Sequence, residues 1–130
     1  MRAILIDPFQ QTVTDVDYSG DYKQIYQLIE ADLFTCVTFN QAGDAVFIDD
    51  EGLFKDSDEQ RYFVLTDDNG NSQLLAGRGL VLGLDASGES ISPTVTLEQV
   101  QAKVYWPEHE WAAAEAERLL GLSGQVFPFI

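Results

Sequence analysis

The chain has few basic residues. Seven Lys and Arg face twenty-two Asp and Glu over 130 residues, which gives a formal net charge of −15. A surface this negative repels the phosphates of nucleic acids and the headgroups of anionic lipids, so we expect no direct binding to nucleic acid or to membranes. Two uses of the charge remain open: binding cations, and presenting carboxylates to a partner protein with a basic surface.

Cysteine pairs and long hydrophobic runs are also absent. The single cysteine, Cys36, excludes an intramolecular disulfide and a cysteine-rich zinc site. No stretch approaches the ~18 consecutive apolar residues of a membrane-spanning helix. The apolar run at residues 3–6 is shorter than the core of a signal peptide. We therefore expect a cytoplasmic protein.

Residues that commonly act as nucleophile and base are equally scarce. The chain has one histidine, His109, and no motif that orients it toward Cys36. Alternation in residues 33–39 predicts a buried Cys36 thiol, and the glutamate-rich segment around His109 predicts an exposed imidazole. We therefore expect a non-catalytic protein without a cofactor, with a small hydrolase or transferase as the third alternative.

The apolar content is sufficient for one core, since 45% of the residues are hydrophobic and 12% are aromatic. Short β-branched and aromatic segments between turns predict a single α+β domain. It is expected to contain a bent antiparallel sheet of about five to seven strands and two or three helices. We place the core in residues 1–106. Residues 107–130 are expected to form an alanine-rich helix and an apolar tail, packed on the core or on a second subunit.

Two helices of the core begin at the spacing of a capping box, Asp21 with Gln24 and Thr96 with Gln99. The C-terminal segment contains large apolar residues that are rarely left in water. We expect them to form a homodimer contact or a contact between elements. These residues are Trp111, Phe127, Phe129 and Ile130.

The first candidate site is the Gly-Arg-Gly turn at Gly77, Arg78 and Gly79. Backbone amides in such a turn can approach an anion, and a guanidinium can bind phosphate or carboxylate as a fork. The turn lacks a third glycine and precedes a strand, so it is not a nucleotide-binding fingerprint. Two interpretations stay open: a tight turn with an exposed arginine, and a small-molecule site that also uses the acidic corner Asp49 and Asp50.

The second candidate site is the acidic stretch between Asp44 and Gly70. Clustered carboxylates suit a divalent cation, but the spacing of a calcium-binding loop is broken, so turn formation is favoured and no metal site is predicted. The stretch can instead imitate a row of phosphates and bind a basic protein surface; the alternative is a solvated surface that prevents aggregation. Its acids are Asp44, Asp49, Asp50, Glu51, Asp56, Asp58, Glu59, Asp67 and Asp68.

Three segments carry a resemblance to a known group of proteins: GDAVFIDDEGLF, LLAGRGLVLGLDASGES and SPTVTLEQVQAKV. Together with the start MRAILIDP, they resemble a family of short uncharacterised proteins of bacteria, phages and other mobile elements, over residues 1–105. The resemblance implies an accessory protein and no assigned activity. We therefore favour a binding protein or inhibitor that acts through its negative surface on a protein partner. Sequestration of a small ligand at the Gly-Arg-Gly turn is the alternative.

Overall fold

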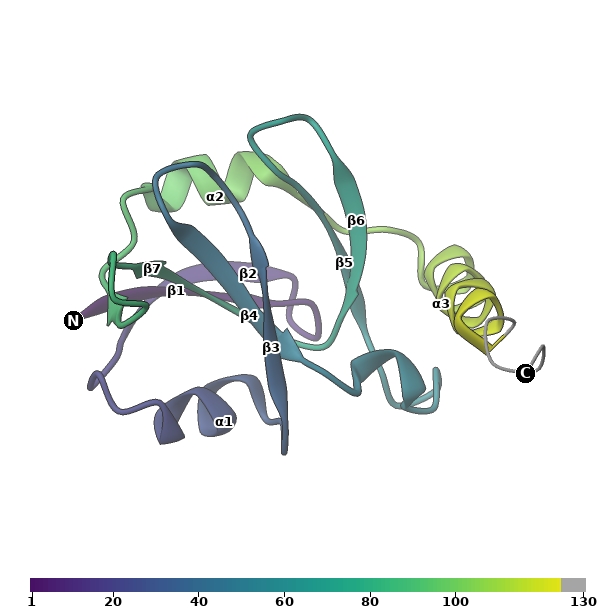
Figure 1. Cartoon of the computed structure of the whole chain (residues 1–130). Coiled ribbons are helices and arrows are strands. Elements are labelled where there is room, and N and C mark those ends of the chain that lie inside the picture. The colour runs from purple at the N-terminus through teal and green to yellow at the C-terminus, as the bar shows by residue number, and fades with distance from the viewer. Residues whose placement is uncertain (125–130) are drawn as a thin grey trace.

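Two antiparallel sheets form the body of the protein (Figure 1). The computed structural model describes residues 1–124, and the side chains of residues 1–121. The predicted α+β fold with a bent antiparallel sheet and two or three helices is confirmed: the described residues form three helices and nine strands, where about five to seven strands were expected, and the strands divide between a six-stranded and a three-stranded sheet. In chain order the elements are β1 (Arg2–Asp7), β2 (Thr12–Asp17), α1 (Lys23–Ile29), β3 (Phe34–Thr38), β4 (Asp44–Asp49), the 3₁₀ turn η1 (Gly52–Phe54), β5 (Tyr62–Thr66), β6 (Ser72–Ala76), β7 (Gly79–Leu84), β8 (Ser90–Ile91), α2 (Leu97–Lys103), β9 (Val104–Tyr105) and α3 (His109–Gly124).

The larger sheet has the order β2-β1-β7-β4-β3, and β8 pairs with β7 outside this path. Its central strands are buried on both faces. In β4, for example, Ala45 and Phe47 belong to a core that includes Ile25 of α1, whereas Val46 and Ile48 belong to a core shared with the smaller sheet. Because successive side chains of a strand point to opposite faces, one short apolar strand supplies both cores.

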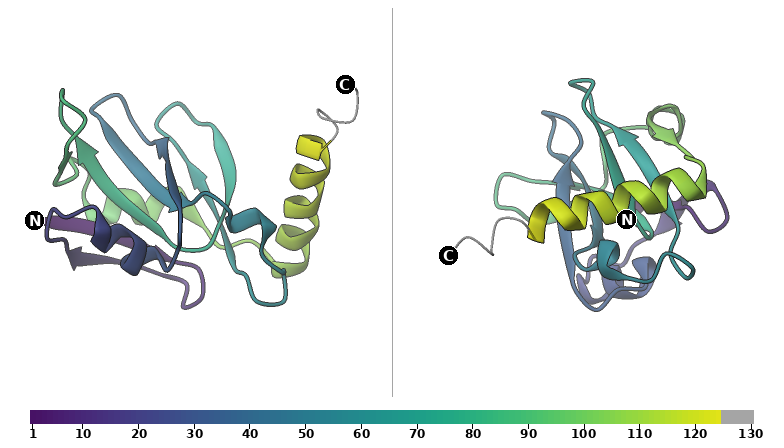
Figure 2. Two further views of the ribbon diagram at one scale, coloured as in Figure 1. Left: turned by 60° about the horizontal axis from the view of Figure 1, so that its bottom comes forward. Right: turned by 90° about the vertical axis from the view of Figure 1, so that its right-hand side faces the viewer.

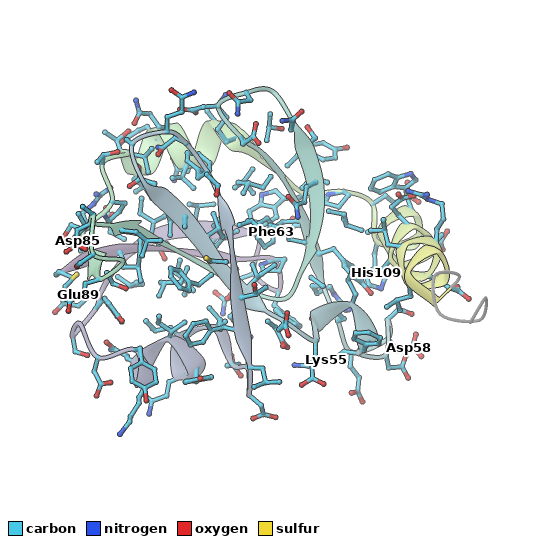
Figure 3. The ribbon with its side chains drawn as sticks, in the orientation of Figure 1. Lys55, Asp58, Phe63, Asp85, Glu89 and His109 are labelled. Atoms are coloured by element: carbon cyan, nitrogen blue, oxygen red, sulfur yellow. The ribbon has the colours of Figure 1, made fainter. Side chains whose placement is uncertain are left out.

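The smaller sheet has the order β6-β5-β9 and is joined to the larger one through Phe63. Phe63 is fully buried, and Figure 3 shows it near the middle of the molecule. A Cβ atom on Gly79 would lie 3.0 Å from both the tip of the Phe63 ring and a methyl group of Val46. The absence of a side chain at position 79 therefore lets the two sheets pack closely.

The two predicted capping boxes have different outcomes. At α2 the box is confirmed, because the Gln99 amide donates to Thr96 Oγ1 at 3.1 Å and the Thr96 amide donates to Gln99 Oε1 at 2.9 Å. At α1 the box was wrong. Gln24 Oε1 accepts from the Ser19 amide instead, whereas the Asp21 carboxylate accepts from the Lys23 amide at 3.0 Å, so only the aspartate of the predicted pair bonds to the start of the helix. A neighbouring turn thus competes for the glutamine.

Replacing Thr96 with Ala should lower the free energy of unfolding by about 1 kcal/mol, since one helix amide loses its acceptor. Urea denaturation followed by circular dichroism measures this difference. Thr14→Ala, at an exposed position of β2, is a matched control and should change stability by less than about 0.5 kcal/mol. Equal effects of the two changes would contradict the capping role.

Helix α3 lies at one end of the molecule beside the smaller sheet (Figure 2). Ala112 and Ala116 pack against Tyr62 and Ala76, which leaves Trp111 exposed. The contact proposed for Trp111 therefore stays a prediction, and Phe127, Phe129 and Ile130 lie outside the described residues. Among residues 1–124, no helix is both long enough and apolar enough to span a bilayer.

Candidate functional site

Carboxylates gather at the end of the larger sheet where β1 and β4 finish and β7 begins. Ile6 and Ile48 both pair with Gly79, so the residues that follow β1 and β4 meet the residues that precede β7. The segment after α1 and the loop that contains η1 lie at the same end of the molecule (Figure 1). We call this region the acidic end and define it by its exposed acids: Glu30, Asp32, Asp50, Glu51, Asp56, Asp58 and Glu59.

The acidic end has a hollow with apolar residues beside it. A cavity of about 260 Å³ is lined by Glu30, Asp32, Asp49, Glu51, Phe54 and Lys55. Phe54 is 73% exposed, and Leu33 is also exposed. The Asp50 amide donates to the Leu33 carbonyl at 3.2 Å, which ties the η1 loop to the start of β3. The acids therefore surround exposed apolar surface.

Asp49 lies at this end, but both oxygens of its carboxylate already contact groups of the protein itself. Its Oδ2 lies 3.0 Å from Lys55 Nζ, and its Oδ1 accepts from the Glu51 amide at 2.9 Å. Asp49 is buried, whereas Asp50 beside it is exposed. The ion pair also neutralises Lys55, so the one lysine of the cavity adds little positive potential.

The Gly-Arg-Gly turn lies next to Asp49, because Ile48 pairs with Gly79, so the fold brings together the turn and the acidic corner of the predicted small-molecule site. The side chain of Arg78, however, is held by contacts within the protein. Arg78 Nη1 is 2.6 Å from Glu30 Oε2, and Arg78 Nε is 3.4 Å from Asp7 Oδ2. The guanidinium also lies 4.5 Å from the centre of the Phe9 ring. The Arg78 side chain is only 20% exposed, so the predicted exposed arginine was wrong. Its two carboxylate partners leave little of the guanidinium for a ligand.

The glycines of that turn are also explained by the fold. Gly77 has φ +82°, in the left-handed region that glycine tolerates, and its amide donates to the Arg61 carbonyl at 2.8 Å. Gly79 leaves room for the Phe63 ring, as described above. Neither glycine therefore needs a bound anion to account for its presence.

The predicted acidic surface is divided by the fold. Asp44 and Asp49 are buried, so they cannot contribute to an exposed surface, and this part of the prediction was wrong. Asp67 and Asp68 lie in the turn between β5 and β6, where the Asp68 amide donates to the Phe39 carbonyl beyond the other end of β3. Glu30 and Asp32, which were not part of the predicted acidic stretch, also contribute exposed carboxylates to the acidic end.

Asp44 has a structural role that its sequence position does not indicate. It is 1% exposed, and its carboxylate accepts from Asn40 Nδ2 at 2.8 Å and from the Thr94 amide and hydroxyl at 2.9 and 2.6 Å. The Val95 amide donates to it at 3.2 Å. Burial alone raises the pKa of Asp44, but the hydrogen bonds from Thr94, Asn40 and Val95 outweigh it and lower the pKa below its usual value.

No metal centre forms from the acidic corners. Asp85 and Glu89 follow β7, whereas Asp49 follows Ile48, which pairs with Gly79 at the start of that strand, so the two groups of acids lie at opposite ends of the sheet. Figure 3 shows Asp85 and Glu89 far from Lys55, the partner of Asp49. The described residues contain no group of three or more His, Cys, Asp or Glu side chains arranged to hold a metal ion.

Cys36 and His109 both differ from their predicted environments. Cys36 is exposed, and it lies on β3, an edge strand of the larger sheet. His109 is half-buried; its Nε2 lies 2.9 Å from the Ser57 carbonyl oxygen, and its ring is 5.8 Å from that of Tyr62. A backbone carbonyl only accepts hydrogen bonds, so Nε2 carries the proton that is donated.

These observations define a small α+β protein in which exposed carboxylates surround an exposed aromatic residue at one end of an antiparallel sheet. Residues 1–105 match the model of a family described as Domain of unknown function (DUF3846), and the chain belongs to that family. The resemblance to an uncharacterised family that the sequence indicated is thereby confirmed. Comparison with curated proteins and with solved structures gave no match.

Proposed function

We propose that the protein is a non-catalytic binding protein whose acidic end contacts a partner protein with a basic surface. The observation that carries this proposal is the position of Phe54, which is 73% exposed beside a hollow lined by carboxylates. An aromatic centre with a polar rim is the usual composition of a protein-binding surface.

Solubility alone does not account for this arrangement. Exposed acids keep a protein soluble wherever they lie, but they do not require Phe54 and Leu33 to be exposed among them, and burying these two side chains against a partner would be favourable. Two of the basic side chains near the acidic end, Lys55 and Arg78, are each paired with carboxylates. The remaining negative potential is available to steer a basic partner toward the aromatic centre.

The partner is expected to combine Lys or Arg side chains with an apolar pocket for Phe54. A protein that binds nucleic acid has such a basic surface, and carboxylates in place of phosphates would occupy it. Within this proposal the protein is an accessory protein or inhibitor that is encoded by a mobile element and acts on its protein partner, in line with the sequence resemblance. The Gly-Arg-Gly turn receives less support as a ligand site, because Arg78 is occupied by Asp7 and Glu30.

The proposal is tested by removing charge at the acidic end without removing internal contacts. The variant Asp32→Asn, Asp50→Asn, Glu51→Gln and Asp58→Asn changes exposed side chains that make no hydrogen bond or ion pair within residues 1–121. Affinity for the partner captured at low salt should fall at least ~10-fold, and the dependence of affinity on salt should become weaker. Calorimetric titration of the purified pair measures both quantities.

A matched control makes the same change in charge elsewhere. Asp17→Asn, Glu89→Gln, Glu98→Gln and Glu117→Gln alter four exposed acids outside the acidic end. The control should bind within about twofold of the unaltered protein, since only long-range potential changes. Phe54→Ala should weaken binding by roughly 30-fold, as expected when a buried aromatic of an interface is truncated. Equal losses in both four-residue variants would indicate non-specific charge attraction and contradict the proposal.

A further inference from the structure

A second cavity lies where the β1–β2 turn, the start of β5 and the start of α3 meet. It has a volume of about 400 Å³, and its lining includes Phe9, Gln11, Arg61, Tyr62, Trp106 and His109. Pockets for small molecules typically have ~300–1,000 Å³. The cavity is therefore large enough for a ligand of one or two rings.

Arg61 is the exceptional arginine of this chain. Of the four arginines, Arg2, Arg78 and Arg118 are each paired with at least one carboxylate. Arg61 is exposed, has no carboxylate within 4.0 Å among the described residues, and donates one hydrogen bond at 2.7 Å to the Gln60 carbonyl. A guanidinium left without an acid in a protein of charge −15 is available to an anionic ligand.

The aromatic part of the lining is held in place by its neighbours. His109 Nε2 donates to the Ser57 carbonyl oxygen, and the ring lies beside that of Tyr62. The Phe9 ring packs against the Arg78 guanidinium, which is fixed by Asp7 and Glu30. Because these rings are already ordered, a planar ligand can stack on them with little loss of side-chain entropy.

We propose that this cavity binds a small planar ring that carries one phosphate or carboxylate group. The ring stacks on the aromatic side chains, and the anionic group pairs with Arg61. Trp106 and His109 lie beyond residues 1–105, which the family model matches, so the C-terminal segment of this chain completes the site. The inference goes beyond the proposed function, because it concerns a different cavity and a different class of ligand.

The test uses the full chain with Trp111→Phe, so that Trp106 is the sole tryptophan and reports on the cavity by its fluorescence. AMP and benzoate are the probes, and neutral adenosine and inorganic phosphate are their controls. We expect saturable quenching by AMP, by benzoate or by both, and at least ~10-fold weaker binding of adenosine and of phosphate alone, since each lacks one half of the recognition. The probe that binds distinguishes a phosphate from a carboxylate group.

Variants then locate the binding. In the same background, Arg61→Gln should weaken binding of the probe at least ~10-fold, while Arg118→Gln, an equal change of charge at an exposed site, should not. Glu108→Gln should strengthen binding, because it removes a carboxylate from the lining of the cavity. Absence of saturable quenching by either probe, or equal affinities of the Arg61 and Arg118 variants, would overturn the inference without affecting the proposed function of the acidic end.

Discussion

Replacing Asp44 with Ala should lower the free energy of unfolding by about 3 kcal/mol. The change leaves partly buried donors of Asn40 and Thr94 and the buried Val95 amide without their acceptor, and it releases the segment before α2 from β4. Urea denaturation measures the loss. Asp85→Ala is the matched control, because Asp85 accepts from the amides of Ser87 and Glu89 at an exposed turn, where water can replace the carboxylate.

The loss at Asp85 should be clearly smaller than the loss at Asp44, since exposed turn contacts contribute little. Similar losses for the two variants would show that burial of Asp44 does not matter. The pH dependence gives a second check. Because hydrogen bonds lower the pKa of folded Asp44 below the usual value of 3.8, its contribution is complete above about pH 4 and is lost as the pH falls through the folded pKa. Asp44→Asn should therefore lose less stability between about pH 5 and pH 2 than the unaltered protein.

Replacing Phe63 with Ala should lower the free energy of unfolding by about 3–5 kcal/mol. The ring is fully buried between the two sheets, where it packs against Val46 and Gly79, so its removal leaves a cavity at their junction. Thermal and urea denaturation followed by circular dichroism measure the change. One cooperative transition is expected, because a single core includes residues of both sheets.

Phe54→Ala is the control for the same chemical change at an exposed position, and it should alter stability by less than about 0.5 kcal/mol. This control also shows whether a loss of partner binding in Phe54→Ala can be attributed to unfolding. A Phe63→Ala variant that keeps its stability would contradict the packing of the two sheets around this ring.

Local sequence signals predicted the elements that depend on neighbouring residues. Thr96 and Gln99 marked the start of α2 correctly, since both partners of a capping box lie within one turn. The division of the strands between two sheets was not predictable in this way. Strand pairing joins segments far apart in the chain, as when Ile6 and Ile48 both pair with Gly79.

The candidate site shows the same limit. The partners of Asp44 in Thr94 and Val95 are 50 and 51 residues away, so the sequence alone placed this buried acid on the surface. The pairing of Arg78 with Glu30 was hidden for the same reason. What the sequence did indicate was the acidic η1 loop, because Asp50, Glu51 and their neighbours are consecutive and remain together in the fold.

The most direct measurement places a photo-crosslinking group at the centre of the acidic end. Phe54→benzoylphenylalanine and the control Tyr105→benzoylphenylalanine, at an exposed position of β9, are each irradiated in a lysate of cells that encode the protein. We expect position 54 to cross-link one basic protein in a salt-sensitive manner, and position 105 to leave that protein unlabelled. No product at position 54, or the same products at both positions, would contradict partner binding through the acidic end.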